Sequence, residues 1–322
     1  MTTLAEVAAG VHRLSLPIPF EEGAVNVYLF REGDSLDLLD CGMNTPESLG
    51  LLRDAIERVG GRPRRLVITH IHPDHYGAAG PLVEEWGMEL LMHRLEVPLV
   101  HPRYLELETL VEEVGRHLSL HGVPEREAEE LKNASRSLRD FVMPAEVDLQ
   151  LDGAETLELG GRRLLVDWTP GHSPGHICLF DVEERLLFSG DQLLAEISPN
   201  IALHPQSTPN PLDDYTAALR RLSAHEPRMV FPAHGRPFGD PDEVVEGLIA
   251  HHERRKDRMV ELIGDREMSA WDVALGVWGY RKQLWERRLA LQEGLAHLQS
   301  LAVAGRLEKR ASTVAVTWRR PR

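Results

Sequence analysis

The chain has 322 residues, of which 42% are hydrophobic and 27% are charged. This composition is typical of a globular protein with a sizeable core and excludes a disordered or fibrous chain. No apolar run approaches the roughly 20 residues that a membrane-spanning helix needs. The N-terminal stretch also lacks the basic and then apolar pattern of a secretion signal. We therefore expect a cytoplasmic protein without a membrane partner.

The formal net charge of −15 is unevenly distributed. Residues 251–322 carry 15 Lys and Arg against 9 Asp and Glu, which leaves 21 against 42 for the rest of the chain. An acidic body argues against wide contact with nucleic acid, whereas a basic end could supply some. The two cysteines, Cys41 and Cys178, are too few for a disulfide framework and are expected to be reduced and buried.

Short strands are predicted at residues 11–16, 25–30 and 36–40, and a helix at residues 47–59. The apolar, β-branched run at residues 65–69 then predicts a strand that is buried on both faces. A helix start follows after residue 77. Four side chains of metal-ligand type occupy the turn between that strand and that helix: His70, His72, Asp74 and His75. Imidazoles and carboxylates in such a turn suit zinc and its first-row neighbours.

Residues 95–143 differ from their surroundings because their apolar residues recur at helical spacing. We interpret this stretch as a helical insertion in a sheet protein. An insertion beside a site is a natural lid and would shape a substrate pocket.

Further candidate ligands follow three later strands. Predicted strands at residues 163–168, 186–190 and 229–232 lead to His172, Asp191 and His234. Ligands in open α/β architectures lie just past the carboxyl ends of strands. These side chains are therefore expected to converge with the first four on one metal site.

With these motifs, the sequence resembles the metallo-β-lactamase superfamily over about residues 10–240. The pattern H-x-H-x-D-H matches residues 70–75, and G-H-S-P-G-H, S-G-D and P-A-H-G match the later ligands. The resemblance implies an α/β fold, a four-layer αββα sandwich with its site at the sheet edge. It also implies two divalent metal ions, zinc first, with iron and manganese left open.

The resemblance assigns a role to each ligand. One ion would take His70, His72 and His172, and the other Asp74, His75 and His234, with Asp191 bridging the two. Asp40 matches an acidic position that supports the ligands in this family. The alternative is that Asp40 only caps the end of its strand, and both interpretations stay open.

Residues 241–322 are predicted to form a separate, mostly helical domain after a catalytic domain at residues 1–240. Three helices and a final hairpin are expected, with a capping-box start at Ser269. This order resembles a winged-helix-like module. Superfamily members with such a tail include thioesterase-like hydrolases and single-stranded RNA endonucleases. The module either walls the substrate site or docks nucleic acid.

We expect a hydrolase in the style of hydroxyacylglutathione hydrolase, in which a metal-bridging hydroxide attacks an ester, thioester or lactone carbonyl. Asp74 is the candidate catalytic residue, since it would orient the nucleophile and carry a proton to the leaving group. Two alternatives remain at this point, namely an RNA endonuclease and a nucleic-acid-binding module with a purely structural metal. The acyl group and the oligomeric state are not specified by the sequence.

Overall fold

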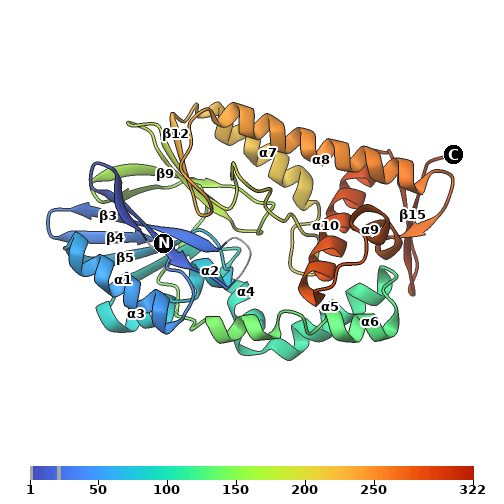
Figure 1. Ribbon diagram of the computed structural model, residues 1–322, viewed down its shortest axis with the longest axis horizontal. Coiled ribbons are helices and arrows are strands. Elements are labelled where there is room, and N and C mark those ends of the chain that lie inside the picture. The colour runs from blue at the N-terminus through green and yellow to red at the C-terminus, as the bar shows by residue number, and fades with distance from the viewer. Residues whose placement is uncertain (1–2, 20–22) are drawn as a thin grey trace.

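Two β-sheets pack face to face in the N-terminal two thirds of the chain, and helices cover their outer faces (Figure 1). The computed structural model describes residues 3–19 and 23–322. The first sheet contains, in spatial order, β1 (Leu4–Ala8), β2 (Val11–Pro17), β3 (Ala24–Glu32), β4 (Ser35–Leu39), β5 (Arg62–Ile68), β6 (Glu89–His93) and β7 (Leu149–Leu151). The second contains β12 (Met229–Pro232), β11 (Leu186–Gly190), β10 (Ile177–Asp181), β9 (Arg162–Trp168) and β8 (Thr156–Leu159).

The helices form the two outer layers. On the first sheet, α1 (Pro46–Val59) packs against β2 and β3, and α3 (Ala79–Trp86) packs against β5 and β6. On the second sheet, α7 (Pro211–Ala224) and the first half of α8 (Pro241–Ile263) cover β10, β11 and β12. The four-layer αββα sandwich expected from the resemblance is therefore confirmed.

Strand direction explains why the candidate ligands meet. In the first sheet, β4, β5, β6 and β7 are parallel to one another. In the second, β9 and β11 are each antiparallel to β10, and β12 is parallel to β11, so β9, β11 and β12 share one direction. Their carboxyl ends consequently lie at one edge of each sheet, where α/β proteins place their sites.

The helical insertion is confirmed as a series of short segments. They are α4 (Val97–Val100), the π-helical turn η1 (His101–Leu105), α5 (Leu107–Leu120), α6 (Glu125–Leu131) and the 3-10 turn η2 (Arg136–Phe141). Leu118 and Leu131 are buried in the same apolar cluster as Trp271 and Leu295 of the C-terminal helices. The insertion thus shares a core with the C-terminal region.

The C-terminal region has the predicted order of elements. After α8 come α9 (Ala270–Trp278), α10 (Leu284–Val303) and the hairpin of β14 (Glu308–Ala311) and β15 (Val316–Arg319), with β13 (Met268–Ser269) pairing with β15. The Ser269 hydroxyl accepts a hydrogen bond from the Asp272 amide at 3.1 Å, which confirms the predicted cap. The likeness to a winged helix and the division at residue 240 stay predictions.

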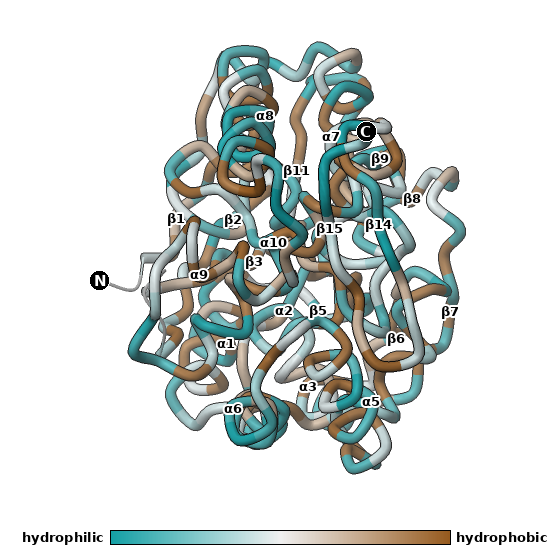
Figure 2. The backbone as a smooth tube through the Cα atoms, turned by 90° about the vertical axis from the view of Figure 1, so that its right-hand side faces the viewer, coloured by the Kyte–Doolittle hydropathy of each residue, from teal (hydrophilic) through white to brown (hydrophobic). Residues whose placement is uncertain are grey.

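Long helix α8 joins the two halves of the molecule. Its Val245 and Leu248 pack on the second sheet's helix layer, whereas its Met259 and Ile263 pack in the C-terminal core. Along α8, the tube of Figure 2 alternates between hydrophilic and hydrophobic residues, as expected for a helix that buries one face. None of the described helices combines the length and the apolar character that a membrane crossing requires.

The elements that were not predicted include β1, β6 and α7 and the short α2 and β13. The insertion also contains less helix than the helical spacing over residues 95–143 predicts, because α6 ends at Leu131 and is followed by turns. Cys41 and Cys178 are buried and free, as predicted.

Phe188 on β11 offers a test of the core between the sheets. Its ring is fully buried, and ring centroids of Phe30 and Phe231 lie 5.0 and 5.2 Å away. We expect Phe188→Ala to lower the free energy of unfolding by about 3–5 kcal/mol, since it removes contacts and leaves a cavity. Val314→Ala, at a side chain that is 79% exposed, is the control and should change it by less than about 0.5 kcal/mol. Equal losses in urea unfolding would contradict the packing described.

Candidate metal centre

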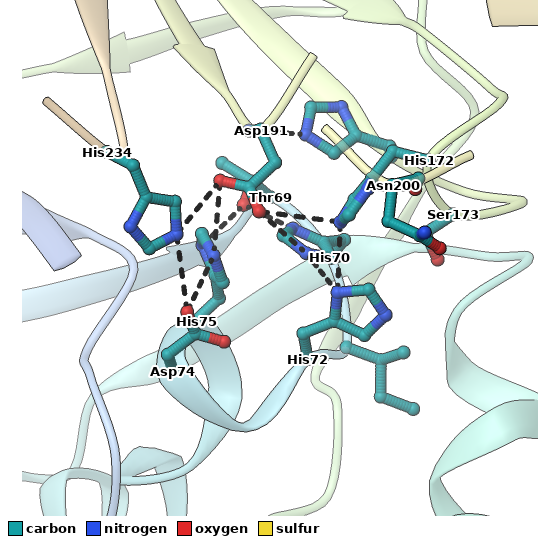
Figure 3. Close-up of polar contacts among 12 residues, drawn as sticks. Thr69, His70, His72, Asp74, His75, His172, Ser173, Asp191, Asn200 and His234 are labelled. Atoms are coloured by element: carbon teal, nitrogen blue, oxygen red, sulfur yellow. Dashed lines mark hydrogen bonds and ion pairs between the residues drawn. The ribbon is translucent and has the colours of Figure 1, made fainter. Parts of the chain in front are cut away.

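All seven candidate ligands lie together at the edge where the two sheets meet (Figure 3). The H-x-H-x-D-H motif begins just after β5, and its second half forms the single-turn helix α2 (Pro73–Tyr76). His172 follows β9, Asp191 follows β11, and His234 follows β12. The convergence predicted from the strand ends is therefore present.

The first group consists of His70, His72, His172 and Asp191, whose ligand atoms all lie within 4.8 Å of one another. His72 Nδ1 is 2.9 Å from His70 Nε2 and 3.0 Å from His172 Nε2. Asp191 Oδ2 lies 3.4 Å from His172 Nε2. These four atoms enclose one point, which is the arrangement that a cation requires.

The second group consists of Asp74, His75 and His234, again within 4.8 Å of one another. His234 Nε2 is 3.3 Å from Asp74 Oδ2, and His75 Nε2 is 3.7 Å from the same oxygen. Asp191 reaches this group with its other oxygen, since Oδ1 lies 3.4 Å from His234 Nε2 and 3.5 Å from His75 Nε2. One carboxylate thus faces both groups.

Two buried atoms at the centre have no hydrogen-bond partner among the described residues, namely Asp191 Oδ1 and His75 Nε2. A buried polar group without a partner is costly. Both atoms point into the space between the ligands and are of the type that binds zinc, iron or manganese. The residues present therefore fit metal ions.

The outward ring nitrogens of two histidines fix the protonation of the inward ones. His172 Nδ1 donates to the Asn200 carbonyl at 3.0 Å, and His234 Nδ1 donates to the Ala24 carbonyl at 2.8 Å. A carbonyl oxygen only accepts, so the proton of each neutral ring sits on Nδ1. The inward Nε2 then presents a lone pair, as a metal ligand must.

Asp40 supports the ligands at the end of β4. Its carboxylate accepts hydrogen bonds from the Thr69 amide at 2.8 Å and the Thr69 hydroxyl at 2.9 Å, and His75 Nδ1 lies 2.8 Å from it. The backbone of Asp40 is left-handed, with φ of 61°, a conformation that costs energy in a non-glycine residue. Asp40 therefore contacts the ring of His75, a candidate ligand, in addition to following the end of a strand.

Glu96 connects the two ligand loops and was not among the predicted site residues. Its buried carboxylate accepts from the Ile71 amide at 2.9 Å, the Ser173 hydroxyl at 2.5 Å and the Gly175 amide at 2.6 Å. Ile71 sits between two candidate ligands, and Ser173 follows a third. One side chain thus fixes the separation of loops that are about a hundred residues apart in the sequence.

His176 belongs to the G-H-S-P-G-H motif but lies behind the centre. Its Nε2 accepts a hydrogen bond from the Asp191 amide at 3.1 Å, and its Nδ1 is 2.8 Å from the Thr169 hydroxyl. Gly190 packs against this ring so closely that an added Cβ would lie 2.6 Å from His176 Nε2. A glycine is therefore needed directly before Asp191.

The protonation states agree with a metal site. Burial and neighbouring imidazoles hold the pKa of His70 and of His72 well below the ordinary value of 6.5, so both rings are neutral. Burial alone would raise the pKa of Asp191, but His234 and His75 hold it well below its usual range. Burial would likewise lower the pKa of His234, yet Asp191 and Asp74 raise it to about 9. The centre therefore holds ionised carboxylates and attracts positive charge.

Comparison with known proteins agrees with this geometry. Residues 21–234 match the family described as the metallo-beta-lactamase superfamily. The chain is 28% identical over 305 residues to a protein named "Probable metallo-hydrolase YqjP" of Bacillus subtilis, covering 89% of this chain and 91% of that protein. It is also 29% identical over 235 residues to acyl-coenzyme A thioesterase MBLAC2 of Bos taurus, covering 68% of this chain and 76% of the relative.

Two solved structures are similar to the chain over almost its whole length. The metallo-beta-lactamase family protein TTHA1429 from Thermus thermophilus superposes with a TM-score of 0.86 at 32% identity, covering 98% of this chain and 100% of that one. A beta-lactamase domain protein from Burkholderia ambifaria superposes with a TM-score of 0.86 at 27% identity, covering 99% and 94%. The chain therefore belongs to the metallo-beta-lactamase superfamily and is a metal-dependent hydrolase.

Proposed function

We propose that this chain uses two divalent metal ions, zinc in the first place, to hydrolyse a thioester, ester or lactone of a small molecule. The observation that carries the proposal is the position of Asp191, whose two oxygens face two separate groups of ligand atoms. A carboxylate in that position suits a pair of cations rather than one. The relative MBLAC2, named an acyl-coenzyme A thioesterase, supports the thioester as first choice.

Cations held there would bring the pKa of a bound water toward neutrality and polarise the carbonyl of the substrate. The residues of the chain would hold these ions and orient the rings that bind them. His70, His72 and His172 would hold one ion and Asp74, His75 and His234 the other, with Asp191 between them. Asp40, Asn200 and Ala24 fix the rings from behind.

Asp74 is the candidate for moving a proton. Its Oδ2 faces His75 and His234, whereas no described residue hydrogen-bonds to its Oδ1. The pKa of Asp74 is lowered, because His75 and His234 outweigh the effect of burial, so the group is ionised and able to accept. In thioester hydrolysis a carbon–oxygen bond forms from water and the carbon–sulfur bond breaks. Asp74 Oδ1 would take the proton of the water and deliver it to the leaving sulfur.

The nucleic-acid alternatives have less support. Several basic residues of the C-terminal region are paired with carboxylates, so their charge is partly neutralised. The pairs are Arg306 with Asp257, Arg310 with Glu267, Arg319 with Glu308 and Lys256 with Glu253. Phosphate contacts need free cations, and none of the named relatives is described as a nuclease.

Removal of the bridging carboxylate tests the proposed function. We expect zinc-loaded wild-type protein to release thiol from a simple acyl thioester, and a chelator to abolish this release. Asp191→Ala should lower kcat/KM at least about a hundredfold and reduce bound zinc, because both ions lose a ligand. Asp54→Ala, at an exposed residue, is the matched control and should behave like wild type. No hydrolysis of thioesters, esters and lactones by zinc-loaded protein would contradict the proposal, and equal activity in Asp191→Ala would indicate a contaminant.

The raised pKa of His234, about 9, predicts a proton release on metal binding. Below that pKa the metal-free ring is protonated, and a metal ion must displace the proton to reach Nε2. Apparent zinc affinity should therefore rise between pH 6 and 8, by about tenfold per pH unit for each proton displaced. Calorimetry in buffers of different ionisation enthalpy measures the release directly. Heat that is independent of the buffer, with a flat affinity over this range, would show that the ring is already neutral.

Glu96 should act on the metal centre through the loops that it joins. In Glu96→Gln, the amide nitrogen can accept none of the three hydrogen bonds, so at least one donor faces another donor. We expect zinc affinity to fall about 10- to 100-fold, as for other residues that orient metal ligands. Zinc competition with a chromogenic chelator measures this. Glu85→Gln, which removes an exposed carboxylate paired with Arg53, is the control. A Glu96 variant with unchanged zinc affinity would mean that the loops hold their separation without it.

A further inference from the structure

Two arginines near the metal centre lack the carboxylate partners that several other buried or half-buried arginines have. Among the described residues, Arg103 Nε donates to the Gln206 side-chain oxygen at 2.9 Å, and Arg288 Nη2 donates to the Ser135 hydroxyl. Neither forms an ion pair in this part of the chain, and Arg288 Nε is buried without any partner. By contrast, the half-buried and buried guanidinium groups of Arg162, Arg255 and Arg287 pair with Asp181, Glu293 and Glu127.

Arg103 on η1 and Arg288 on α10 belong to elements that contact the same short segment, residues 203–206. Burial and, second, the positive charge of Arg103 lower the pKa of Arg288 to about 10. A partly buried cation beside another cation is unfavourable unless an anion joins them. Arginine is suited to this role because its planar fork matches phosphate and carboxylate oxygens.

A third donor, His204, lies between Leu203, which contacts α10, and Gln206, which contacts Arg103. His204 Nδ1 accepts a hydrogen bond from the Gln206 amide at 3.1 Å, so the proton of the neutral ring is on Nε2. Burial and the charges of Arg103 and Arg288 keep the pKa of His204 well below its usual value. The ring is therefore neutral and offers an N–H in the neighbourhood of both arginines.

Residues 200–206 connect these donors to the metal centre. At one end the Asn200 carbonyl accepts from His172, as Figure 3 shows. In the middle the Leu203 amide donates to the Gln292 carbonyl at 3.0 Å, one turn of α10 after Arg288. At the other end Gln206 holds Arg103.

The insertion makes a second connection on the same side. Next to Arg103, the Tyr104 hydroxyl donates to the Ile71 carbonyl at 2.6 Å, between His70 and His72. The charge of Arg103 also contributes, after burial and His172, to the low pKa of His72. The element that carries Arg103 is therefore bonded to the backbone beside His72, and the helix that carries Arg288 is bonded to the segment that holds His172.

We propose that Arg103 and Arg288, together with His204, bind an anionic group of the substrate, a phosphate or a carboxylate, while its carbonyl reaches the metal ions. This inference rests on the proposed hydrolase function and names the class of substrate that the site takes. Such a group would lie at the thiol or alcohol end of the substrate or on its acyl chain. Its two negative oxygens would satisfy the two cations at once.

Three thioesters with the same acyl group test this at the thiol end. The coenzyme A thioester carries phosphates, the glutathione thioester carries carboxylates, and the N-acetylcysteamine thioester is neutral. We expect Arg103→Gln and Arg288→Met to raise KM at least about tenfold for one or both anionic thioesters, with less than a twofold change for the neutral one. Arg288→Lys, which keeps the charge, should restore part of the loss. The control Arg254→Met removes an exposed arginine of α8 and should change none of the three.

The preferred thioester identifies the anion, since an effect confined to coenzyme A indicates phosphate and one confined to glutathione indicates carboxylate. A uniform fall in kcat/KM for all three thioesters in both variants would overturn the proposal, because it would mean that the arginines only stabilise the fold. The proposal would also be overturned if both variants kept the wild-type KM and kcat/KM for all three thioesters. Wild-type selectivity for the neutral thioester would have the same consequence.

A binding measurement keeps this proposal separate from the proposed function. If zinc-loaded wild-type protein hydrolyses no thioester, the proposed function fails and the arginine site is tested by calorimetry with adenosine 3′,5′-bisphosphate and with glutathione disulfide. Zinc is present in every variant, so the difference between wild type and Arg103→Gln/Arg288→Met reports the arginines. A tenfold or greater loss of affinity for either probe supports the site. Equal affinities for both probes overturn it.

Discussion

The buried carboxylate of Asp191 is the group on which the metal centre depends. Taking an ionised carboxylate out of water costs several kcal/mol unless donors or cations surround it. Here Oδ1 has no donor among the described residues, and the inward nitrogen of His172 offers a lone pair because its proton faces a carbonyl group. The inward nitrogen of His234 offers one as soon as that ring loses its extra proton, since its other nitrogen also faces a carbonyl group. The centre is thus a set of acceptors that face one another, and positive charge is what stabilises it.

Such a centre needs a rigid surround, and the contact between the two sheets supplies it. The Ile177 amide of the second sheet donates to the Thr69 carbonyl at 3.0 Å, and the Asn26 amide donates to the Ala233 carbonyl at 2.7 Å. The Asn26 side chain donates in addition to the Pro232 carbonyl at 3.0 Å. These bonds join backbone next to the ligands across the two sheets. The aromatic core around Phe188 lies behind them, so packing between the sheets and ligand geometry are coupled.

The sequence predicts those parts of the fold and the site that are marked by local motifs, and it does not predict those that depend on contacts between distant residues. The seven candidate ligands could be named from the sequence because they sit in short motifs at the ends of apolar strands, and Asp40 because it matches an acidic position of the family that the sequence resembles. Glu96 was not predicted, since no motif in the adjacent sequence marks it and its partner Ser173 is 77 residues away in the chain. Arg103 and Arg288 were missed for the same reason, as a missing ion pair is visible only in three dimensions. The strand β6 was missed because it is a short apolar run, and α7 because its residues had no motif to mark them.

The C-terminal region was predicted as a separate domain, and its contacts argue for a closer role. Glu293 on α10 pairs with Arg255 on α8, and the Asn200 side chain lies 3.5 Å from the same carboxylate. Asn200 in turn holds His172 through its carbonyl. The core that α10 shares with α5 also fixes the insertion from which Arg103 extends. A shift of α10 would therefore alter both a candidate metal ligand and the proposed anion site. This arrangement explains how superfamily members with one metal centre can differ in substrate, because the segments that would choose the substrate lie outside the sheets that carry the ligands.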